Sequence, residues 1–377
     1  MTPDLTATSS TADPSTTLTA DVVVVGGGAA GLAAAIALGR SRRSVVLVDA
    51  GEPRNAPAEG AHNVLGQEGI SPLELLARGR AEAEAYGVRL VSGRVTDASG
   101  VVDSFTLEID GAPGGGAGLS ADALEVDASG SDRGQAVAST TRQVTARRVI
   151  LATGLVDELP DVPGVAQAWG HTVLHCPYCH GWEVRDQRVA VLATTENALH
   201  QVMLFRQLSD DVTLFLHDAP EPTDEQWEQL AALGVRVVTP RVERLVVEGT
   251  QVRSVEVEGG RSFAVDAVVV APRFVARTEL YEALGGEKTT SPFGEQVVAD
   301  PRGATAVPGV WVAGNSGDLM AMVVAAAASG VMAGAAVNGD LAATDLARAV
   351  AERRAPFSAA MESEVALAVA GDRRHGL

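Results

Sequence analysis

The only two cysteines of the 377-residue chain are Cys176 and Cys179, which lie three positions apart. This spacing permits a redox-active disulfide, because a thiolate at one position can exchange with a disulfide that includes the other. Pro177 suits the first position of a helical turn, which would place both sulfurs near the N-terminus of the turn, where thiolates are stabilised. The segment therefore predicts thiol–disulfide chemistry.

Two other interpretations of the cysteine pair stay open. Zinc accepts Cys and His ligands, so the two cysteines could hold a metal together with His171, His175 or His180. Adjacent Cys–His pairs rarely converge on one tetrahedron, which weighs against this interpretation. The cysteines could also be a buried pair without a redox role. We predict a redox pair and no metal site.

A glycine-rich loop follows the first apolar run of the chain and precedes an apolar helical pattern. In a G-x-G-x-x-G loop of this kind, Gly26 allows a tight turn, Gly28 admits a pyrophosphate and Gly31 lets helix and strand pack closely. Asp49 ends the next predicted strand, about 20 residues on, where an acid binds ribose hydroxyls. We predict a dinucleotide site here. Its phosphate-binding residues are Gly26, Gly28, Ala29, Ala30 and Gly31.

The elements that must position these motifs alternate between apolar strands and helical patterns, which is typical of parallel α/β folds. One strand–helix–strand unit surrounds the glycine loop (strands at 21–25 and 44–48), and a second begins at residue 188. Residues 104–109 and 144–152 are predicted to pair as a hairpin would. The other predicted elements are strands at 188–192, 212–216, 235–238, 244–247, 253–258, 267–271 and 309–313, and helices at 29–38, 71–86, 196–208 and from about 319.

Residues 111–141 lie between the two strands of the predicted pair and are rich in Gly, Ser and Thr. A connection of this length without regular structure is unusual inside a compact domain. We interpret it as a surface insertion that leaves the strand pair intact. A binding loop is the alternative, but no aromatic or cationic residues cluster there.

Composition limits the class of protein. The chain has 29 Lys and Arg against 48 Asp and Glu, a formal net charge of −19, which argues against nucleic acid or an anionic membrane as a partner. Residues 1–20 have no Lys or Arg and no apolar run, so we expect a disordered tail and not a secretory signal. Uncharged stretches at 22–39 and 319–337 reach membrane-span length, but their Gly and Ala content predicts buried elements. We expect a cytoplasmic protein.

Further segments carry a resemblance to a known family. Residues 151–154 (Leu-Ala-Thr-Gly) and 310–315 resemble the two later signatures of flavoproteins with two dinucleotide domains, with Asn315 in place of the usual acid. The glycine loop, residues 151–154, Cys-Pro-Tyr-Cys-His-Gly at 176–181 and residues 310–315 follow one another in the order found in low-molecular-weight thioredoxin reductases. The chain therefore resembles that family over about residues 20–340. The cysteine motif and residues 49–55 resemble the dithiol oxidase branch, which closes disulfides in natural products such as gliotoxin, holomycin and romidepsin.

The resemblance implies an α/β fold of two Rossmann-like dinucleotide-binding domains, the second inserted into the first. Residues 20–154 and 276–377 would form the FAD-binding domain after a disordered tail at 1–19, and residues 155–275 a degenerate NADPH-type domain with the cysteine pair. It also implies FAD as the cofactor and a homodimer. Besides the glycine loop, the implied FAD-contacting residues are Asp49, Ala50, Arg54, Asn55, Asn63, Ala152, Thr153, Gly154, Gly314 and Asn315.

The second strand–helix–strand unit lacks the features that bind NADPH in that family. No glycine occurs at residues 189–198, where the Cβ atoms of Ala193 and Thr195 would obstruct a pyrophosphate and Glu196 would repel it. Residues 216–221 are acidic where the reductases carry arginines for the 2′-phosphate. We therefore expect that NADPH is not the electron donor. The alternative is NADPH bound in an altered geometry.

The implied activity is oxidation of a small-molecule dithiol, with O₂ as the electron acceptor and H₂O₂ as a product. A substrate thiolate would attack Cys176, and Cys179 would pass electrons to FAD. His180 stands where the related reductases carry an aspartate, and imidazole titrates near neutrality, so His180 is the predicted base. His175 could share this role, and His180 could instead be structural. Two other functions stay open: a thioredoxin reductase-like enzyme that acts on a protein with another electron donor, and a flavin-bound redox sensor without turnover.

Overall fold

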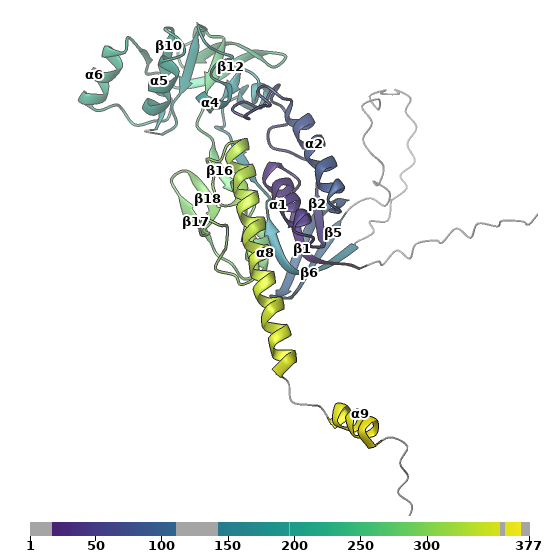
Figure 1. Ribbon diagram of the computed structural model, residues 1–377. Coiled ribbons are helices and arrows are strands. Elements are labelled where there is room, and N and C mark those ends of the chain that lie inside the picture. The colour runs from purple at the N-terminus through teal and green to yellow at the C-terminus, as the bar shows by residue number, and fades with distance from the viewer. Residues whose placement is uncertain (1–16, 111–141, 196, 355–358, 371–377) are drawn as a thin grey trace, which may run out of the picture.

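The computed structural model describes residues 17–110, 142–195, 197–354 and 359–370. The predicted tail (apart from residues 17–19), the insertion at 111–141 and Glu196 therefore lie outside the described residues. Two largely parallel sheets dominate the described part of the chain, and each is built on a strand–helix–strand unit (Figure 1). Each unit positions one of the two predicted chemical motifs.

The first sheet is centred on β1 (Leu18–Val25), which pairs in parallel with β2 (Val45–Asp49) and β6 (Arg142–Leu151). The valines of β1 are buried on both faces, as expected for a central parallel strand. β5 (Ser104–Asp110) pairs antiparallel with β6, which confirms the predicted strand pair. The sheet runs β3-β2-β1-β6-β5-β4, with β19 also on β6. The remaining bounds are β3 (Arg89–Ser92), β4 (Arg94–Val101) and β19 (Val310–Val312).

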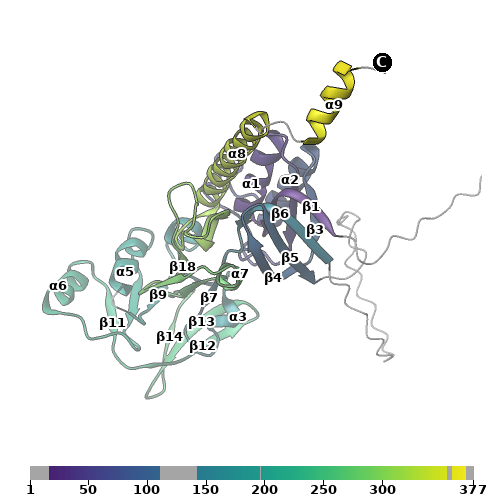
Figure 2. The same cartoon turned by 90° about the horizontal axis from the view of Figure 1, so that it is seen from below.

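Helices α1 (Ala29–Arg40), α2 (Pro72–Ala85) and α8 (Val323–Arg354) cover one face of this sheet (Figure 2). On the other face, side chains of the strands, β4 and β5 included, form a second core with the short helix α7 (Glu279–Ala283). Since α1 begins directly after the glycine loop, this layering places the N-terminus of α1 at the carboxyl edge of β1.

Helix α8 packs directly on α1, because small residues let the two backbones meet. A Cβ atom on Gly330 would lie 2.0 Å from the backbone oxygen of Ala30, and one on Gly334 would lie 2.8 Å from that of Ala34. By length and composition α8 could also cross a membrane, a test that core helices pass too. The close contact assigns the first half of α8 to the core of the first sheet. Helix α9 (Ala359–Ala370) lies beyond the end of α8 (Figure 1).

The second sheet is entirely parallel and runs β11-β10-β9-β15-β8. Its strand–helix–strand unit consists of β9 (Val189–Leu192), α5 (Ala198–Arg206) and β10 (Val212–Phe215). A capping box of Thr223 and Gln226 starts the next helix, α6 (Asp224–Ala232). A three-stranded antiparallel sheet, β12-β13-β14, packs against this unit. The other bounds are α3 (Val165–Ala168), β8 (Val173–Leu174), β11 (Arg236–Val238), β12 (Val242–Glu248), β13 (Gln251–Val257), β14 (Arg261–Ala264) and β15 (Ala267–Val269).

The chain passes from the first sheet to the second through β7 (Leu155–Glu158) and returns through β16 (Arg273–Ala276), and these two strands pair antiparallel. They belong to a fourth sheet with β17 (Lys288–Ser291) and β18 (Gly294–Val297). The second Rossmann-like unit is thus inserted into the first, which confirms the predicted fold class. The exact domain boundaries stay a prediction.

Candidate active site

Cys176 and Cys179 form a disulfide, with their Cα atoms 5.3 Å apart. Pro177 begins the short helix α4 (Pro177–His180), as predicted, and Cys176 is its N-cap residue. The sulfur of Cys176 accepts the backbone N–H of Cys179 at 3.2 Å. Both cysteines are only half-buried. The pair is therefore placed where a thiol in solution can reach it and where a Cys176 thiolate gains a hydrogen bond.

The ring of His175 is packed between two aromatic rings. It stacks on Trp169 at 5.7 Å between centroids and meets the edge of Phe274 at 5.5 Å. Burial, assisted by the positive charge of Arg54, lowers the pKa of His175 to about 4. A group with this pKa is a weak base at neutral pH, so the structure favours His180 over His175 as the base.

His180 lies at a polar cavity of about 510 Å³ that His171, Glu59 and Glu183 also line. Burial lowers the pKa of His180, and the negative charge of Glu183 partly opposes this shift. The imidazole is therefore neutral at neutral pH and able to accept a proton. Its catalytic role stays a prediction.

The alternative of a metal at the cysteine pair gains no support. In the described parts of the chain, no three Cys, His, Asp or Glu side chains lie close enough together to hold a metal ion. The cysteines are engaged with each other in the disulfide instead.

The glycine loop has the geometry of a phosphate cradle. Gly26 has φ +104°, and a Cβ atom there would lie 2.3 Å from the backbone oxygen of Ala152. A Cβ on Gly31 would lie 1.8 Å from the oxygen of Gly26, so both positions require glycine. Gly28 is extended, and a Cβ built on it meets no atom within 4 Å. The loop is thus open at Gly28, at the N-terminus of α1, which fits the pyrophosphate of FAD.

Asp49 is held against this loop at the end of β2. One carboxylate oxygen accepts the N–H of Gly27 at 3.0 Å, and the other accepts the guanidinium of Arg80 at 2.7 Å. Each oxygen keeps a free lone pair for a ribose hydroxyl. No sequence pattern identifies Arg80, which comes from α2, 31 residues away.

The two later signature segments meet at the carboxyl edge of the first sheet. The N–H of Gly154 donates to the Ser316 hydroxyl at 3.0 Å, and the Thr153 hydroxyl lies 3.1 Å from the same oxygen. Ser316 ends a short 3₁₀ helix at Gly314–Ser316. A Cβ on Gly314 would lie 2.8 Å from the Cβ of Ala30, so this helix also abuts the first turn of α1. Ser316 lies one residue beyond the signature at 310–315, and no sequence motif indicates its role.

Asn315 uses its side-chain nitrogen within its own loop. The amide donates to the backbone oxygens of Asp318 at 2.9 Å and Ala321 at 3.0 Å. Its side-chain oxygen remains as the group that could face FAD. The contact of Asn315 with the cofactor stays a prediction.

Two predicted FAD contacts reach toward the second domain. The guanidinium of Arg54 forms a bidentate ion pair with Asp157, at 2.7 and 2.6 Å, and lies over the ring of Phe274 at 5.4 Å. The side-chain amide of Asn63 donates to the backbone oxygen of Tyr178 at 2.7 Å. The roles predicted for Arg54 and Asn63 in FAD binding stay predictions, and so do those of Ala50 and Asn55 in the same loop.

The corresponding loop of the second unit has Ala193, Thr194 and Thr195 in place of the three glycines that follow β1. Ala193, which directly follows β9, is 2% exposed and packs in the apolar core of this unit. Its backbone N–H donates to the oxygen of Phe215 at 2.9 Å, which holds it against β10. The Cβ of Ala193 thus occupies space that a glycine would leave free.

The basic side chains that follow β10 are already paired. Asp218 forms a bidentate ion pair with Arg241, at 2.8 and 2.9 Å. Burial lowers the pKa of His217, and its Nδ1 accepts the N–H of Val242 at 3.2 Å, so this imidazole is neutral. Neither Arg241 nor His217 is free to bind a 2′-phosphate.

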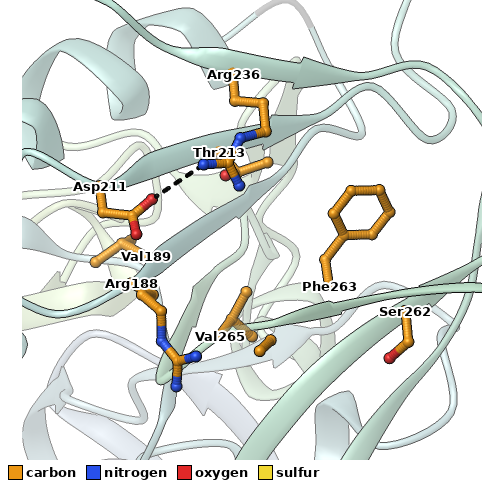
Figure 3. Close-up of a pocket in the computed structure, with 9 residues that line it drawn as sticks. Arg188, Val189, Asp211, Thr213, Arg236, Ser262, Phe263 and Val265 are labelled. Carbon is orange, nitrogen blue, oxygen red and sulfur yellow. Dashed lines mark ion pairs between the residues drawn. The ribbon is translucent and has the colours of Figure 1, made fainter.

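A separate cavity of about 300 Å³ lies at the opposite edge of the second sheet, at the start of β9, β10 and β11 (Figure 3). Arg236 lies 3.8 Å from Asp211 there, and Arg188 pairs with Asp266. Nucleotides bind at the carboxyl ends of the strands in such sheets. This cavity is therefore not a second nucleotide site.

The chain is similar to proteins of known structure and sequence. It is 41% identical to HlmI, with a TM-score of 0.74 and coverage of 88% of this chain and 96% of HlmI. It is 35% identical to an oxidoreductase from Agrobacterium tumefaciens, with a TM-score of 0.75 and coverage of 86% and 99%. Thioredoxin reductase tcpT of Claviceps purpurea is 30% identical over 335 residues, which are 85% of this chain and 94% of tcpT.

Thioredoxin reductase sirT of Leptosphaeria maculans is also 30% identical, over 87% of this chain and 96% of sirT. The family model described as pyridine nucleotide-disulphide oxidoreductase matches residues 20–330. The chain therefore belongs to the pyridine nucleotide-disulphide oxidoreductase family, and its thioredoxin reductase-like relatives are FAD-binding flavoproteins.

Proposed function

We propose that the protein is an FAD-dependent dithiol oxidase, which forms a disulfide in a small-molecule dithiol and uses O₂ as the electron acceptor. The observation that carries this proposal is the second unit, which keeps its fold but has Ala193 in place of the first glycine of the loop and pairs Asp218 with Arg241. Both features disfavour NADPH as the source of electrons. The half-exposed cysteines offer a route from a thiol substrate instead.

In the proposed reaction, a substrate thiolate attacks the sulfur of Cys176, which breaks the disulfide and leaves Cys179 as a thiolate. The second substrate thiol gives its proton to His180 and attacks the substrate sulfur of the mixed disulfide. Oxidised substrate leaves, and the departing Cys176 thiolate is stabilised by the N–H of Cys179.

Two electrons have then moved from the substrate to the two cysteines. One proton went to solvent when the first substrate thiolate formed, and the other is held by His180. When bound, FAD supplies a two-electron acceptor that returns the cysteines to the disulfide and delivers the electrons to O₂, which gives H₂O₂.

A protein disulfide as the substrate is the second candidate, and the names of the thioredoxin reductases tcpT and sirT favour it. Tyr178 and Trp182 flank the cysteines and are 64% and 65% exposed, which leaves an open surface for a large substrate as well as a small one. The two candidates differ in the direction of electron flow and in the electron donor.

We also propose that the protein is a homodimer. The side of α8 that faces away from α1 exposes the apolar residues Val324, Val331 and Met332. Exposed apolar residues that cluster on one side of a helix mark interaction surfaces. Light scattering coupled to size-exclusion chromatography tests this, and a monomer at micromolar concentration would contradict it.

Oxygen uptake by the purified flavoprotein tests the proposed activity. With dithiothreitol as a model dithiol and no nicotinamide, we expect O₂ consumption and one H₂O₂ for each disulfide formed. NADPH-dependent reduction of a protein disulfide would overturn the proposal in favour of the second candidate. Flavin that a dithiol reduces without continued O₂ uptake would instead indicate a redox sensor without turnover.

A further inference from the structure

A segment of the first domain reaches the cysteine turn of the second domain. We call residues 54–68, between β2 and α2, the strap. Two backbone hydrogen bonds tie the middle of the strap to the residues that follow it: the buried Ala61 donates its N–H to the oxygen of Ile70 at 2.8 Å, and Gly69 donates to the oxygen of Ala61 at 3.0 Å. Its tip, His62 and Asn63, therefore projects from a closed loop of fixed shape.

Glu68 holds the tip of the strap in place. One of its carboxylate oxygens accepts the N–H of Asn63 at 2.8 Å, and the other lies 2.8 Å from Nδ1 of His62. Asn63 has φ +59°, a left-handed conformation that asparagine tolerates better than most residues. The side-chain amide of Asn63 is thus oriented before it meets its partner.

The tip contacts the segment that carries the disulfide. The amide of Asn63 donates to the backbone oxygen of Tyr178, which lies between the two cysteines, at 2.7 Å. Nε2 of His62 lies 3.5 Å from Glu183, three residues after His180. These contacts join the domain that carries the glycine loop to the turn that carries the sulfurs.

A second set of contacts fixes the other end of the strap on the interdomain connection. Arg54 pairs with Asp157 of β7 and lies over the Phe274 ring of β16. Pro57 packs against Gly170, where a Cβ atom would lie 2.8 Å from the proline ring. The strap therefore spans from the connecting strands to the cysteine turn.

We propose that Asn63 is a positioning residue that holds the cysteine turn at a fixed distance from the FAD-binding loop during electron transfer. This inference rests on the proposed function. In the step concerned, the thiolates of Cys176 and Cys179 would give two electrons to FAD and their sulfur–sulfur bond would re-form, while the proton held by His180 would pass to the reduced flavin. This step crosses the domain boundary, so its rate depends on how firmly the turn is held. Thiol exchange with the substrate and reoxidation by O₂ do not cross it.

Two variants separate the hydrogen bond from the backbone conformation. Asn63→Gly keeps the left-handed backbone and removes the donor. Asn63→Asp keeps the size of the side chain and turns a carboxylate oxygen toward the Tyr178 carbonyl. Arg42→Gly is the matched control, because Arg42 is also left-handed, with φ +62°, and lies in the turn after α1.

The holoenzyme is mixed with saturating dithiol without oxygen, and flavin absorbance is followed by stopped flow. We expect flavin reduction to slow about two- to tenfold in Asn63→Gly, the range for one hydrogen bond that is open to water, and further in Asn63→Asp. The KM for dithiol and the rate of reoxidation by O₂ should not change. Amide hydrogen exchange over residues 177–181 should become faster. Arg42→Gly should match the wild type in every measurement.

Wild-type rates of flavin reduction in both Asn63 variants would overturn the proposal, as would an equal loss in the reoxidation rate. Failure of the proposed function looks different, because the wild-type flavin would then not be reduced by any dithiol. The hydrogen-exchange comparison still tests the strap in that case, and unchanged exchange over residues 177–181 would overturn it.

Discussion

In the first strand–helix–strand unit the loop between β1 and α1 begins with Gly26 and is open at Gly28, whereas in the second unit the loop between β9 and α5 has the buried Ala193 and then Thr195 at these positions. Both units otherwise have parallel strands on either side of a helix. The loops of the two units therefore differ by a few Cβ atoms, and this difference leaves the strand–helix–strand arrangement intact.

Each unit also has an Asp–Arg ion pair near its second strand, and the two ion pairs have different consequences for ligand binding. In the first unit Asp49 is paired with Arg80 and still faces the open loop. In the second unit Asp218 is paired with Arg241, the cation available to a phosphate. The same pair of residue types therefore supports a ribose site in one unit and neutralises a phosphate site in the other.

The largest expected effect comes from closing the open loop with Gly28→Val. Because Gly28 is extended and its Cβ would meet no atom, the variant should fold with an unchanged circular dichroism spectrum. The branched side chain would occupy the place of the pyrophosphate, so FAD content should fall at least about tenfold. Thr195→Val, in the second loop, is the control and should keep its FAD. A fully flavinated Gly28→Val protein would refute the assignment of the first loop.

A comparably large loss is expected from Cys176→Ser and from Cys179→Ser, since the proposed exchange needs both sulfurs. Each variant should keep FAD in the first unit while dithiol-dependent oxygen uptake disappears. Flavin absorbance and an oxygen electrode measure the two properties on the same sample. Substantial turnover in either variant would mean that substrate reduces the flavin directly, without the second unit.

His180→Ala should slow flavin reduction by dithiol by about 10²–10⁴-fold, the usual loss when a general base is removed. Burial lowers the pKa of His180 below the ordinary histidine value of about 6.5. The imidazole therefore stays neutral to a lower pH than a free histidine does, and the wild-type rate should decline only below about pH 6.5. Without the base, the rate should rise toward the pKa of the substrate thiol. His175→Phe, which keeps the packing on Trp169, is the control with a small expected effect. Unchanged rates for His180→Ala from pH 6 to 9 would remove it from the mechanism.

The smallest effect is expected from partly rebuilding the second loop. NADPH should not reduce the wild-type flavin at a useful rate under anaerobic conditions. The double variant Thr195→Gly, Asp218→Asn removes one obstructing Cβ atom and the ion pair of Arg241 with Asp218. It keeps the buried Cβ atom of Ala193. We expect at most slow flavin reduction at millimolar NADPH. Rapid bleaching of the wild-type flavin would replace the oxidase proposal with a reductase.

The sequence was informative where local pattern determines structure. The apolar runs of β1, β2, β9 and β10 end in turn residues, and Pro177 starts a helical turn, so these elements could be placed without the structure. The strands β7, β16, β17 and β18 were missed, because four-residue, partly exposed segments have too little periodicity to detect. The longer β4 was missed as well, because its buried residues do not alternate regularly with exposed ones.

Contacts between residues that are distant in the chain could not be predicted from pattern at all. The bond from Asn63 to Tyr178 joins residues 115 positions apart, and the pair of Arg80 with Asp49 has no periodic signature. The low pKa of His175 results from packing against Trp169 and Phe274, which only the folded chain brings together. The sequence could therefore identify residues able to do chemistry, but not the side chains and backbone groups that they contact in the fold.

The first turn of α1 is enclosed by glycines from distant parts of the chain. Ala30 is approached by Gly314 and Gly330, and its neighbour Gly31 abuts Gly26. A search for homologues could use these positions together as a signature that is independent of the cysteines. Proteins that keep all of them but have lost Cys-x-x-Cys would then be recognised as flavin carriers whose ancestors exchanged thiols, and a bulky residue at position 330 would mark lineages in which the last long helix has moved away from the cofactor.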